Sequence, residues 1–342
     1  MDLRLAGLGA CLPDRIVTND EVSDLVGIGA QRIAELFEVR RRHWVRRFDA
    51  PEPAEGQHCS DLAAEAGRRA LRDAALDVDA IDTLVTVSIT PDFANPPLDR
   101  LVAAKLGLGA VVGIDLRSAC AGLFRALLVV EGLIAAGRSR CALVVAAETI
   151  SPFFRFGRDV PKDQRLNAAL YGDGAGAMVV SAAGSQGPRL QHVVVCSTGD
   201  PRPPGITFRG MMSATPPSPE RYAAMDYLGH QDFRTVLTRG TELFWQAGNA
   251  VMERAGTTIE SYRYLLAHQA TGNMRSLAAK HGVPPEKFPT NIERVGNTIA
   301  ASIPILLEEI RAEGRLASGD RLLLLAAESS TWSYGGMEIL WE

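Results

Sequence analysis

Strand-like runs that are continuously apolar recur along the whole chain and alternate with helical stretches. Such runs are typical of strands that are covered on both faces by other layers. Amphipathic helices are predicted over Ser60–Leu76, Thr241–Ala255 and Asn297–Ala312. The pattern predicts an α/β fold with layered sheets. The strands are expected at Leu3–Leu8, Thr83–Ser88, Val111–Asp115, Ala142–Ala147, Ala177–Ser181, Leu190–Cys196, Tyr264–Ala267 and Leu322–Ala327.

A short stretch of small and polar residues, 183–187, divides the 342-residue chain nearly in half. We expect two α/β halves of similar size, one over residues 1–182 and the other over 183–342. A chain of this length can bury a large core without a disulfide or a structural metal. The proline-rich residues 201–222 predict a long loop. Long loops inside compact domains are often functional lids or binding loops.

Charge and cysteine usage argue against several classes of function. Lys and Arg number 36 against 40 Asp and Glu, a net charge of −4, so no nucleic-acid or membrane partner is expected. The five cysteines form no Cys-x-x-Cys pair, which indicates no metal site and favours a reducing cytoplasm. Met1–Leu5 resembles a first strand rather than a signal peptide. The longest apolar run, Ala126–Ala136, contains Glu131 and is too short to cross a bilayer.

One cysteine, Cys120, lies at a predicted turn from a strand into a helix, which is a suitable place for a catalytic thiol. It follows the strand that ends at Asp115 and precedes Ala121–Ala136, whose apolar composition predicts a buried central helix. Because the N–H groups and dipole at a helix N-terminus favour an anion, we expect a lowered pKa for this thiol. The alternative is a small buried hydrophobe, which is the better interpretation of Cys11, Cys141 and Cys196.

Two further segments complete a candidate catalytic set. His268 follows the strand Tyr264–Ala267, and Asn297 lies in Gly296–Pro304, a small-residue helix start. A Cys, a His and an Asn on separate strand-to-helix turns make a plausible set for thiol catalysis. Taken singly, His268 is equally well read as a core histidine and Asn297 as a helix cap, and their spacing alone does not decide.

Together these residues resemble the β-ketoacyl-acyl-carrier-protein synthase III family, which has the thiolase fold. The resemblance covers essentially the whole chain and rests on Cys120 with its neighbours, Tyr171–Ala177, His268–Ala270 and Gly296–Pro304. It implies a thiolase-like five-layered α/β/α/β/α fold from two similar halves, and a homodimer. It also implies Cys120, His268 and Asn297 as catalytic residues, and a tight turn at Gly172–Gly176, including Gly174, that supports the nucleophile.

The resemblance also implies a covalent mechanism that needs no resident cofactor. The Cys120 thiolate takes an acyl group from a thioester of coenzyme A or of acyl-carrier-protein phosphopantetheine, and nearby N–H groups hold the oxyanion. In decarboxylating members, a neutral His and an Asn donate hydrogen bonds to the enolate. In members that acylate a hydroxyl or thiol, the His is the general base. Asn297 can only orient or donate.

Three departures from the family pattern concern the donor site, the residue after His-Gln-Ala and the oxyanion. Leu36–Val39 stands where the family commonly has Arg-Thr-Gly-Ile, and the tryptophan and arginine that grip coenzyme A are not evident. Thr271 replaces the Asn that usually follows His-Gln-Ala. Ala327–Trp332 replaces a Gly-rich loop that lends an oxyanion N–H. We expect the backbone of Ser329 to supply that N–H instead.

A further departure concerns the acyl pocket. In the family, a loop of the partner subunit closes this pocket with an apolar residue before Pro; here the loop contains Phe93 and Asn95. Asn95 makes the pocket more polar and suits a short polar or carboxylate-bearing acyl group. These departures resemble the acyltransferase branch of the family found in antibiotic pathways.

We therefore expect an acyltransferase that passes a short, malonyl-like acyl group intact to a hydroxyl, such as that of a sugar, to an amine or to a carrier. One alternative is a decarboxylative synthase that condenses an acyl starter with a malonyl thioester. The other is a non-catalytic partner subunit that kept the fold. Retention of all three catalytic residues argues against the second alternative.

The basic run Arg40–Arg47 is the strongest basic patch of the sequence. One interpretation is a solvated face whose arginine stems cover apolar surface. The other, of equal weight, is a landing site for an acidic carrier protein or a phosphopantetheine phosphate. The residues proposed for donor or carrier binding are Arg40, Arg41, Arg42 and Trp44.

Overall fold

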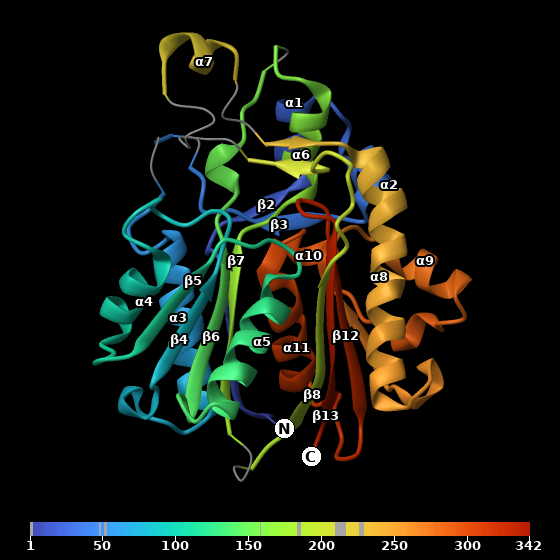
Figure 1. Ribbon diagram of the computed structural model, residues 1–342. Coiled ribbons are helices and arrows are strands. Elements are labelled where there is room, and N and C mark those ends of the chain that lie inside the picture. Colours follow the sequence, from blue (N-terminus) through green and yellow to red (C-terminus); the bar gives the residue numbers. More distant parts are fainter. Residues whose placement is uncertain are drawn as a thin grey trace.

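A nine-stranded sheet runs through the computed structural model, which describes residues 3–47, 49–50, 53–157, 159–182, 186–208, 217–225 and 229–342. The strand order is β11-β12-β13-β8-β1-β7-β6-β4-β5 (Figure 1). The strands are β1 (Leu3–Cys11), β4 (Thr83–Val87), β5 (Val112–Leu116), β6 (Cys141–Glu148), β7 (Gly174–Ser181), β8 (Arg189–Ser197), β11 (Tyr264–Ala267), β12 (Arg321–Glu328) and β13 (Ser333–Leu340).

The strand order repeats between the two halves of the chain. In the first half, β4 runs parallel to β6, and β6, β7 and β1 then pair antiparallel. In the second half, β11 runs parallel to β12, and β12, β13 and β8 pair antiparallel in the same way. The halves join edge to edge where Leu3 and Arg4 of β1 pair with Leu190 and Arg189 of β8.

Helices cover both faces of each half-sheet. Helix α3 (Cys59–Asp73) packs on β1, β6 and β7, and α4 (Leu98–Leu106) packs on α3, β4 and β5. Helices α5 (Gly122–Ala135) and α11 (Ser302–Ala312) contact strands of both halves and form the middle layer. Helix α8 (Phe233–Ala255) covers β8, β12 and β13. The expected five-layered α/β/α/β/α fold is confirmed.

Alternation along the strands divides the core into three clusters. In β6, Val144 and Ala146 face the middle layer, whereas Leu143 and Val145 join the core beneath α3. In β12, Leu322–Leu325 alternates in the same way between the middle layer and the core beneath α8. Successive side chains of a strand point to opposite faces. This explains why the sequence of each strand is continuously apolar.

The remaining elements gather mainly at one end of the sheet, the upper end in Figure 1, opposite both chain termini. They cap the end at which Cys120 lies. The helices at this end are α1 (Asn19–Val26), α2 (Ala30–Phe37), α6 (Lys162–Leu170), α7 (Pro219–Ala223) and α10 (Ile292–Val295). The short strands are β2 (Ile16–Thr18), β3 (Arg41–His43), β9 (Ile206–Thr207) and β10 (His230–Gln231). Helix α9 (Met274–Lys280) lies elsewhere, outside α8.

All eight predicted strands are present. Strand β13 and the short strands β2, β3, β9 and β10 were not predicted, and the predicted helix over Asn297–Ala312 begins only at Ser302. Strand β13 was not predicted, because its Gly335-Gly336 pair interrupts the apolar run. A Cβ on Gly335 would lie 2.7 Å from Phe124 of α5, so the strand needs glycine there to pack closely. Helix α8 begins at Phe233 rather than at 241, because Asp232 caps it by accepting a hydrogen bond from the Thr235 amide.

Candidate active site

Cys120 lies in the connection between β5 and α5 and borders two cavities. The residue is half-buried, and the helix begins at Gly122. The first cavity, of about 60 Å³, brings Cys120 together with His268, Asn297 and Ser329. The second, of about 330 Å³, extends from Cys120 toward the end of β5. The structure thus gathers the three expected catalytic residues around one cavity.

His268 is held by its backbone and by one hydroxyl. Its amide donates to the Leu325 carbonyl of β12 at 2.8 Å. Its ring Nδ1 lies 2.8 Å from Ser302 Oγ, which also accepts from the Gln269 amide at 3.3 Å. Burial lowers the pKa of His268 to about 4, and a hydrogen bond with the Ile299 backbone only partly opposes this. The imidazole is therefore neutral at neutral pH.

Asn297 is fixed by four hydrogen bonds. Its backbone amide donates to Leu170 O, and its carbonyl accepts from Gly172 N, both at 3.0 Å. Its side-chain Oδ1 accepts from the Ile299 amide at 2.9 Å, and Nδ2 donates to the Ala270 carbonyl at 3.3 Å. Because an amide NH₂ carries two protons, one remains for a ligand.

The Gly172–Gly176 segment is not the tight turn that was expected. Strand β7 begins at Gly174, so Gly174 and Gly176 are strand residues that face α11 and its flanks. A Cβ on Gly174 would meet side-chain tips of Leu12 and Ile305 at 3.0 and 3.1 Å. Gly172 is more constrained, because its Cβ would lie 2.0 Å from the Val295 carbonyl oxygen. Because Gly172 has no side chain, the segment that contains Val295 and Asn297 can pack directly against the Gly172 backbone.

The thiol of Cys120 has a raised pKa, and the expectation of a lowered one was wrong. Burial raises it most, followed by the carboxylates of Glu328 and Glu148. The helix N-terminus does act on an anion, but that anion is Glu328, which accepts from the Ala121 amide at 3.1 Å. The thiol is protonated at rest, and neutral His268 is the base available in the same cavity.

Glu328 is a site residue whose role sequence reasoning missed. It is buried at the end of β12, next to Ser329. Its Oε2 accepts from Ser118 Oγ at 3.0 Å and from Ala121 N, and its Oε1 accepts from Ser330 Oγ at 2.8 Å and Thr331 Oγ1 at 3.2 Å. The carboxylate thus ties the Cys120 turn to the Ser329 loop, 207 residues apart in the chain.

Two residues of the basic run lie in the interior, so the prediction of a surface landing site is wrong for them. Arg42 is fully buried, and its Nη2 donates to Asn19 Oδ1 at 2.8 Å and to Ala169 O at 2.7 Å. Trp44 is buried and donates to Tyr171 O at 3.0 Å. Both brace the segment before Gly172. Arg40 and Arg41 are exposed.

The remaining predicted residues differ in their placement. Ser329 borders both cavities beside Cys120. Phe93 and Asn95 are exposed and border neither cavity, and Phe93 is 55% exposed. Ile206, from the proline-rich loop, borders both cavities. Residues 209–216 of that loop lie outside the described residues.

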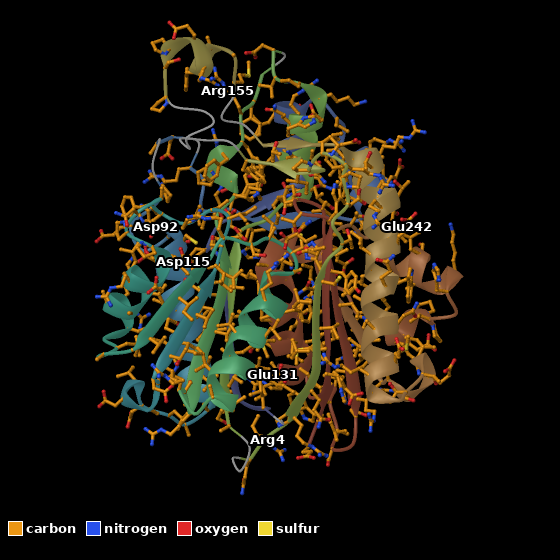
Figure 2. The ribbon with its side chains drawn as sticks, in the orientation of Figure 1. Arg4, Asp92, Asp115, Glu131, Arg155 and Glu242 are labelled. Atoms are coloured by element: carbon orange, nitrogen blue, oxygen red, sulfur yellow. The ribbon has the colours of Figure 1, made fainter. Side chains whose placement is uncertain are left out.

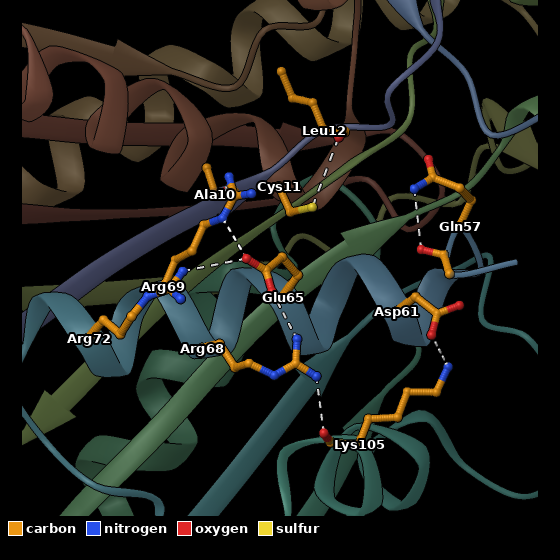
Figure 3. A network of polar contacts seen from close by, with 11 residues as sticks. Ala10, Cys11, Leu12, Gln57, Asp61, Glu65, Arg68, Arg69, Arg72 and Lys105 are labelled. Carbon is orange, nitrogen blue, oxygen red and sulfur yellow. Dashed lines mark hydrogen bonds and ion pairs between the residues drawn. The ribbon is translucent and has the colours of Figure 1, made fainter.

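Cys11 illustrates a cysteine in a different setting (Figure 3). It lies beside the network on α3 in which Arg68 and Arg69 pair with Glu65. Burial raises its pKa to about 11, and its thiol has only a weak contact with the Leu12 carbonyl. The structure gives it no His or Asn partner within the described residues. This agrees with the interpretation of Cys11 as a small hydrophobe.

Among the described residues, no helix is long and apolar enough to cross a membrane. In the same residues, no group of three or more His, Cys, Asp or Glu side chains is arranged to hold a metal ion.

Family models match two parts of the chain. The model of 3-oxoacyl-[acyl-carrier-protein] synthase III matches residues 114–199, and the model of its C-terminal part matches residues 252–341. The first range contains Cys120, and the second contains His268 and Asn297.

Curated relatives and solved structures match over almost the whole chain. Beta-ketoacyl-[acyl-carrier-protein] synthase III 3 of Streptomyces coelicolor is 33% identical, covering 98% of this chain and 96% of the relative. The corresponding synthase III of Nitratidesulfovibrio vulgaris is 35% identical, over 94% and 93%. The structure of FabH from Pseudomonas aeruginosa aligns with a TM-score of 0.85 at 27% identity, over 100% and 98%. That of AbyA1, a tetronic acid condensing enzyme, aligns at 0.87 and 27%, over 99% of each chain. The chain therefore belongs to the 3-oxoacyl-[acyl-carrier-protein] synthase III family.

Proposed function

We propose that this protein is an acyltransferase that loads a short polar acyl group on Cys120 and passes it on intact. The acceptor is a hydroxyl, an amine or a second carrier. The observation that supports the proposal most directly is the meeting of Cys120, neutral His268 and Asn297 around one cavity. The protein uses no resident cofactor, and its acyl donors are thioesters of acyl carrier protein or coenzyme A.

Loading is a thioester exchange. The Cys120 sulfur forms a bond to the acyl carbon, the bond from that carbon to the donor sulfur breaks, and the donor leaves as a thiol. The proton of Cys120 passes through His268 to the leaving sulfur. The backbone N–H groups of Cys120 and Ser329 stabilise the oxyanion.

The transfer step depends on which nitrogen of His268 carries the proton. Ser302 Oγ accepts from the Gln269 amide and can either donate to His268 Nδ1 or accept from it. If Nδ1–H donates to Ser302, Nε2 is a free base that can deprotonate an acceptor hydroxyl. If Ser302 donates to Nδ1, Nε2–H is a donor. The first arrangement fits acyl transfer.

Decarboxylative condensation is the second candidate, and the second arrangement favours it. A neutral imidazole and the remaining Asn297 N–H would then both donate to the enolate formed from a malonyl thioester. The low pKa of His268 keeps the ring neutral, as this step requires. AbyA1, by its printed description a condensing enzyme, is similar in structure.

A homodimer is part of the proposal. Strand β5 is an edge strand, and its Val112 side chain is 45% exposed. Open edges of this kind pair readily with another strand. The exposed loop with Phe93 and Asn95 would then close the acyl pocket of the partner. We place the protein in the cytoplasm, with no nucleic-acid or membrane partner.

The fate of the malonyl carboxyl carbon distinguishes the two candidates. Wild-type protein is incubated with a malonyl thioester labelled in its free carboxyl group, together with an unlabelled acyl thioester as starter and with hydroxyl, amine and carrier acceptors. Acyl transfer predicts that the label stays on Cys120 and then appears in the product. Release of the label as carbon dioxide with a lengthened carbon chain would reject acyl transfer and select condensation.

A further inference from the structure

The second cavity beside Cys120 contains two side chains with fixed charges, Arg117 and Glu328. Its other polar groups include the hydroxyls of Ser330 and Thr331, and its apolar wall includes Ile89 and Phe208. Which of these two charged side chains still has hydrogen-bonding capacity for a ligand decides what kind of acyl group the cavity suits.

Glu328 has no capacity left for a ligand. Each carboxylate oxygen offers about two acceptor positions. Oε2 is occupied by Ser118 and Ala121, and Oε1 by Ser330 and Thr331. Its acceptor positions are therefore occupied by four donors of the protein itself.

Arg117 is in the opposite situation. It follows β5, which ends at Leu116, and it is an exposed residue of the cavity wall. Within the described residues, its guanidinium has no hydrogen-bond or ion-pair partner. Its neighbour Asp115, labelled in Figure 2, is occupied by Thr86 Oγ1 and the Leu98 amide.

One more carboxyl group lies close enough to Arg117 to interact with its charge. Glu148 is buried and accepts from Thr90 Oγ1 and the Ile89 amide. Burial raises its pKa to about 8, and Arg117 only partly opposes this. Glu148 is thus largely neutral at pH 7 and does not cancel the charge of Arg117. Of the charged side chains that border the cavity among the described residues, Arg117 is the one whose hydrogen-bonding capacity is left for a ligand.

We propose that Arg117 binds the free carboxylate of a dicarboxylic acyl group while its other carboxyl carbon is bonded to Cys120. The inference rests on the proposed loading of Cys120 and adds the substrate class: half-thioesters of short dicarboxylic acids. Arg117 lies three positions before Cys120, which limits their Cα atoms to about 11 Å apart. An acyl chain of a few carbons and the long arginine arm can span this distance. A guanidinium binds a carboxylate through two parallel hydrogen bonds.

Succinyl and butyryl thioesters of N-acetylcysteamine test the inference, because both acyl groups have the same chain length and only one carries a charge. Succinyl also lacks the β-keto acid chemistry that lets malonyl decarboxylate. We expect the wild type to load succinyl on Cys120 faster than butyryl. Arg117→Gln should lower the succinyl-to-butyryl rate ratio about tenfold. Arg117→Lys should keep part of the preference.

Arg138→Gln is the matched control, because Arg138 is an exposed arginine beyond the far end of α5. It should leave the ratio unchanged. An Arg117→Gln ratio equal to that of the wild type would overturn the inference while the proposed function stands. Failure of wild-type protein to load either thioester on Cys120 would instead overturn the proposed function.

Discussion

Two acidic side chains act on the Cys120 thiol. After burial itself, Glu328 and Glu148 both raise the pKa of the thiol. In papain-like sites, by contrast, a cationic histidine beside the thiol lowers the pKa of the thiol. Here His268 is neutral, so the thiolate forms only as the proton is transferred. Single residues therefore tune the reactivity of this site.

Replacing Glu328 with Gln should make Cys120 more reactive. Glutamine keeps an oxygen for Ser118 and Ala121 and turns its NH₂ toward the Ser330 and Thr331 oxygens. Removal of the negative charge favours the thiolate, so the midpoint of the pH profile for alkylation of Cys120 by iodoacetamide should move to lower pH. Mass analysis of the Cys120 peptide measures the rate. Glu131→Gln, on helix α5, is the control. An unmoved midpoint in the Glu328 variant refutes the electrostatic role.

The free energy of unfolding should depend on pH through the protonation of Glu148. Its pKa is about 8 in the folded protein against 4.5 as the ordinary value. The folded state thus binds the Glu148 proton more tightly than the unfolded state does. The stabilisation that this proton gives is complete below about pH 4.5 and is lost as the pH rises toward 8.

Urea unfolding at pH 5.5 and pH 8.5 tests this. Glu148→Gln has no proton to lose, so it should show a smaller fall in the free energy of unfolding between the two pH values than the wild type. The comparison uses the difference between pH values, which cancels any loss of hydrogen bonds in the variant. Equal falls in both proteins contradict the raised pKa of Glu148.

At the scale of elements, the site depends on how closely two loops approach. Gly172 N donates to Asn297 O, and the Gly172 Cα faces the Val295 carbonyl. Arg42 and Trp44 donate to the carbonyls of Ala169 and Tyr171, just before Gly172. The position of Asn297 is therefore set by packing between segments far apart in the chain.

Gly172→Ala should displace Asn297. The new methyl group would lie 2.0 Å from a backbone oxygen that cannot rotate away. We expect a loss of about 1–3 kcal/mol in stability, typical of overpacking, together with slower transfer from the acyl-enzyme. Thermal unfolding and single-turnover transfer measure the two effects. Gly174→Ala is the matched control, because its contacts are flexible side-chain ends; equal effects in both variants would contradict a special role of Gly172.

At the scale of the whole molecule, apolar strand runs and helix patterns predict the layers well. The continuous runs at β6 and β12 reflect burial on both faces, which is a local property of the sequence. Glu328 could not be assigned in this way, because its partner amide is 207 residues away. Arg42 looked like surface for the same reason, since its partners Asn19 and Ala169 come together only in the fold.

The acyl-enzyme on Cys120 is the central claim, and intact-protein mass measures it most directly. Wild type, Cys120→Ala and Cys11→Ala are each incubated with a malonyl thioester. The account predicts one intact malonyl adduct on the wild type and on Cys11→Ala, and none on Cys120→Ala. An adduct that persists in Cys120→Ala would contradict Cys120 as the nucleophile, and an acetyl adduct with release of carbon dioxide would contradict intact transfer.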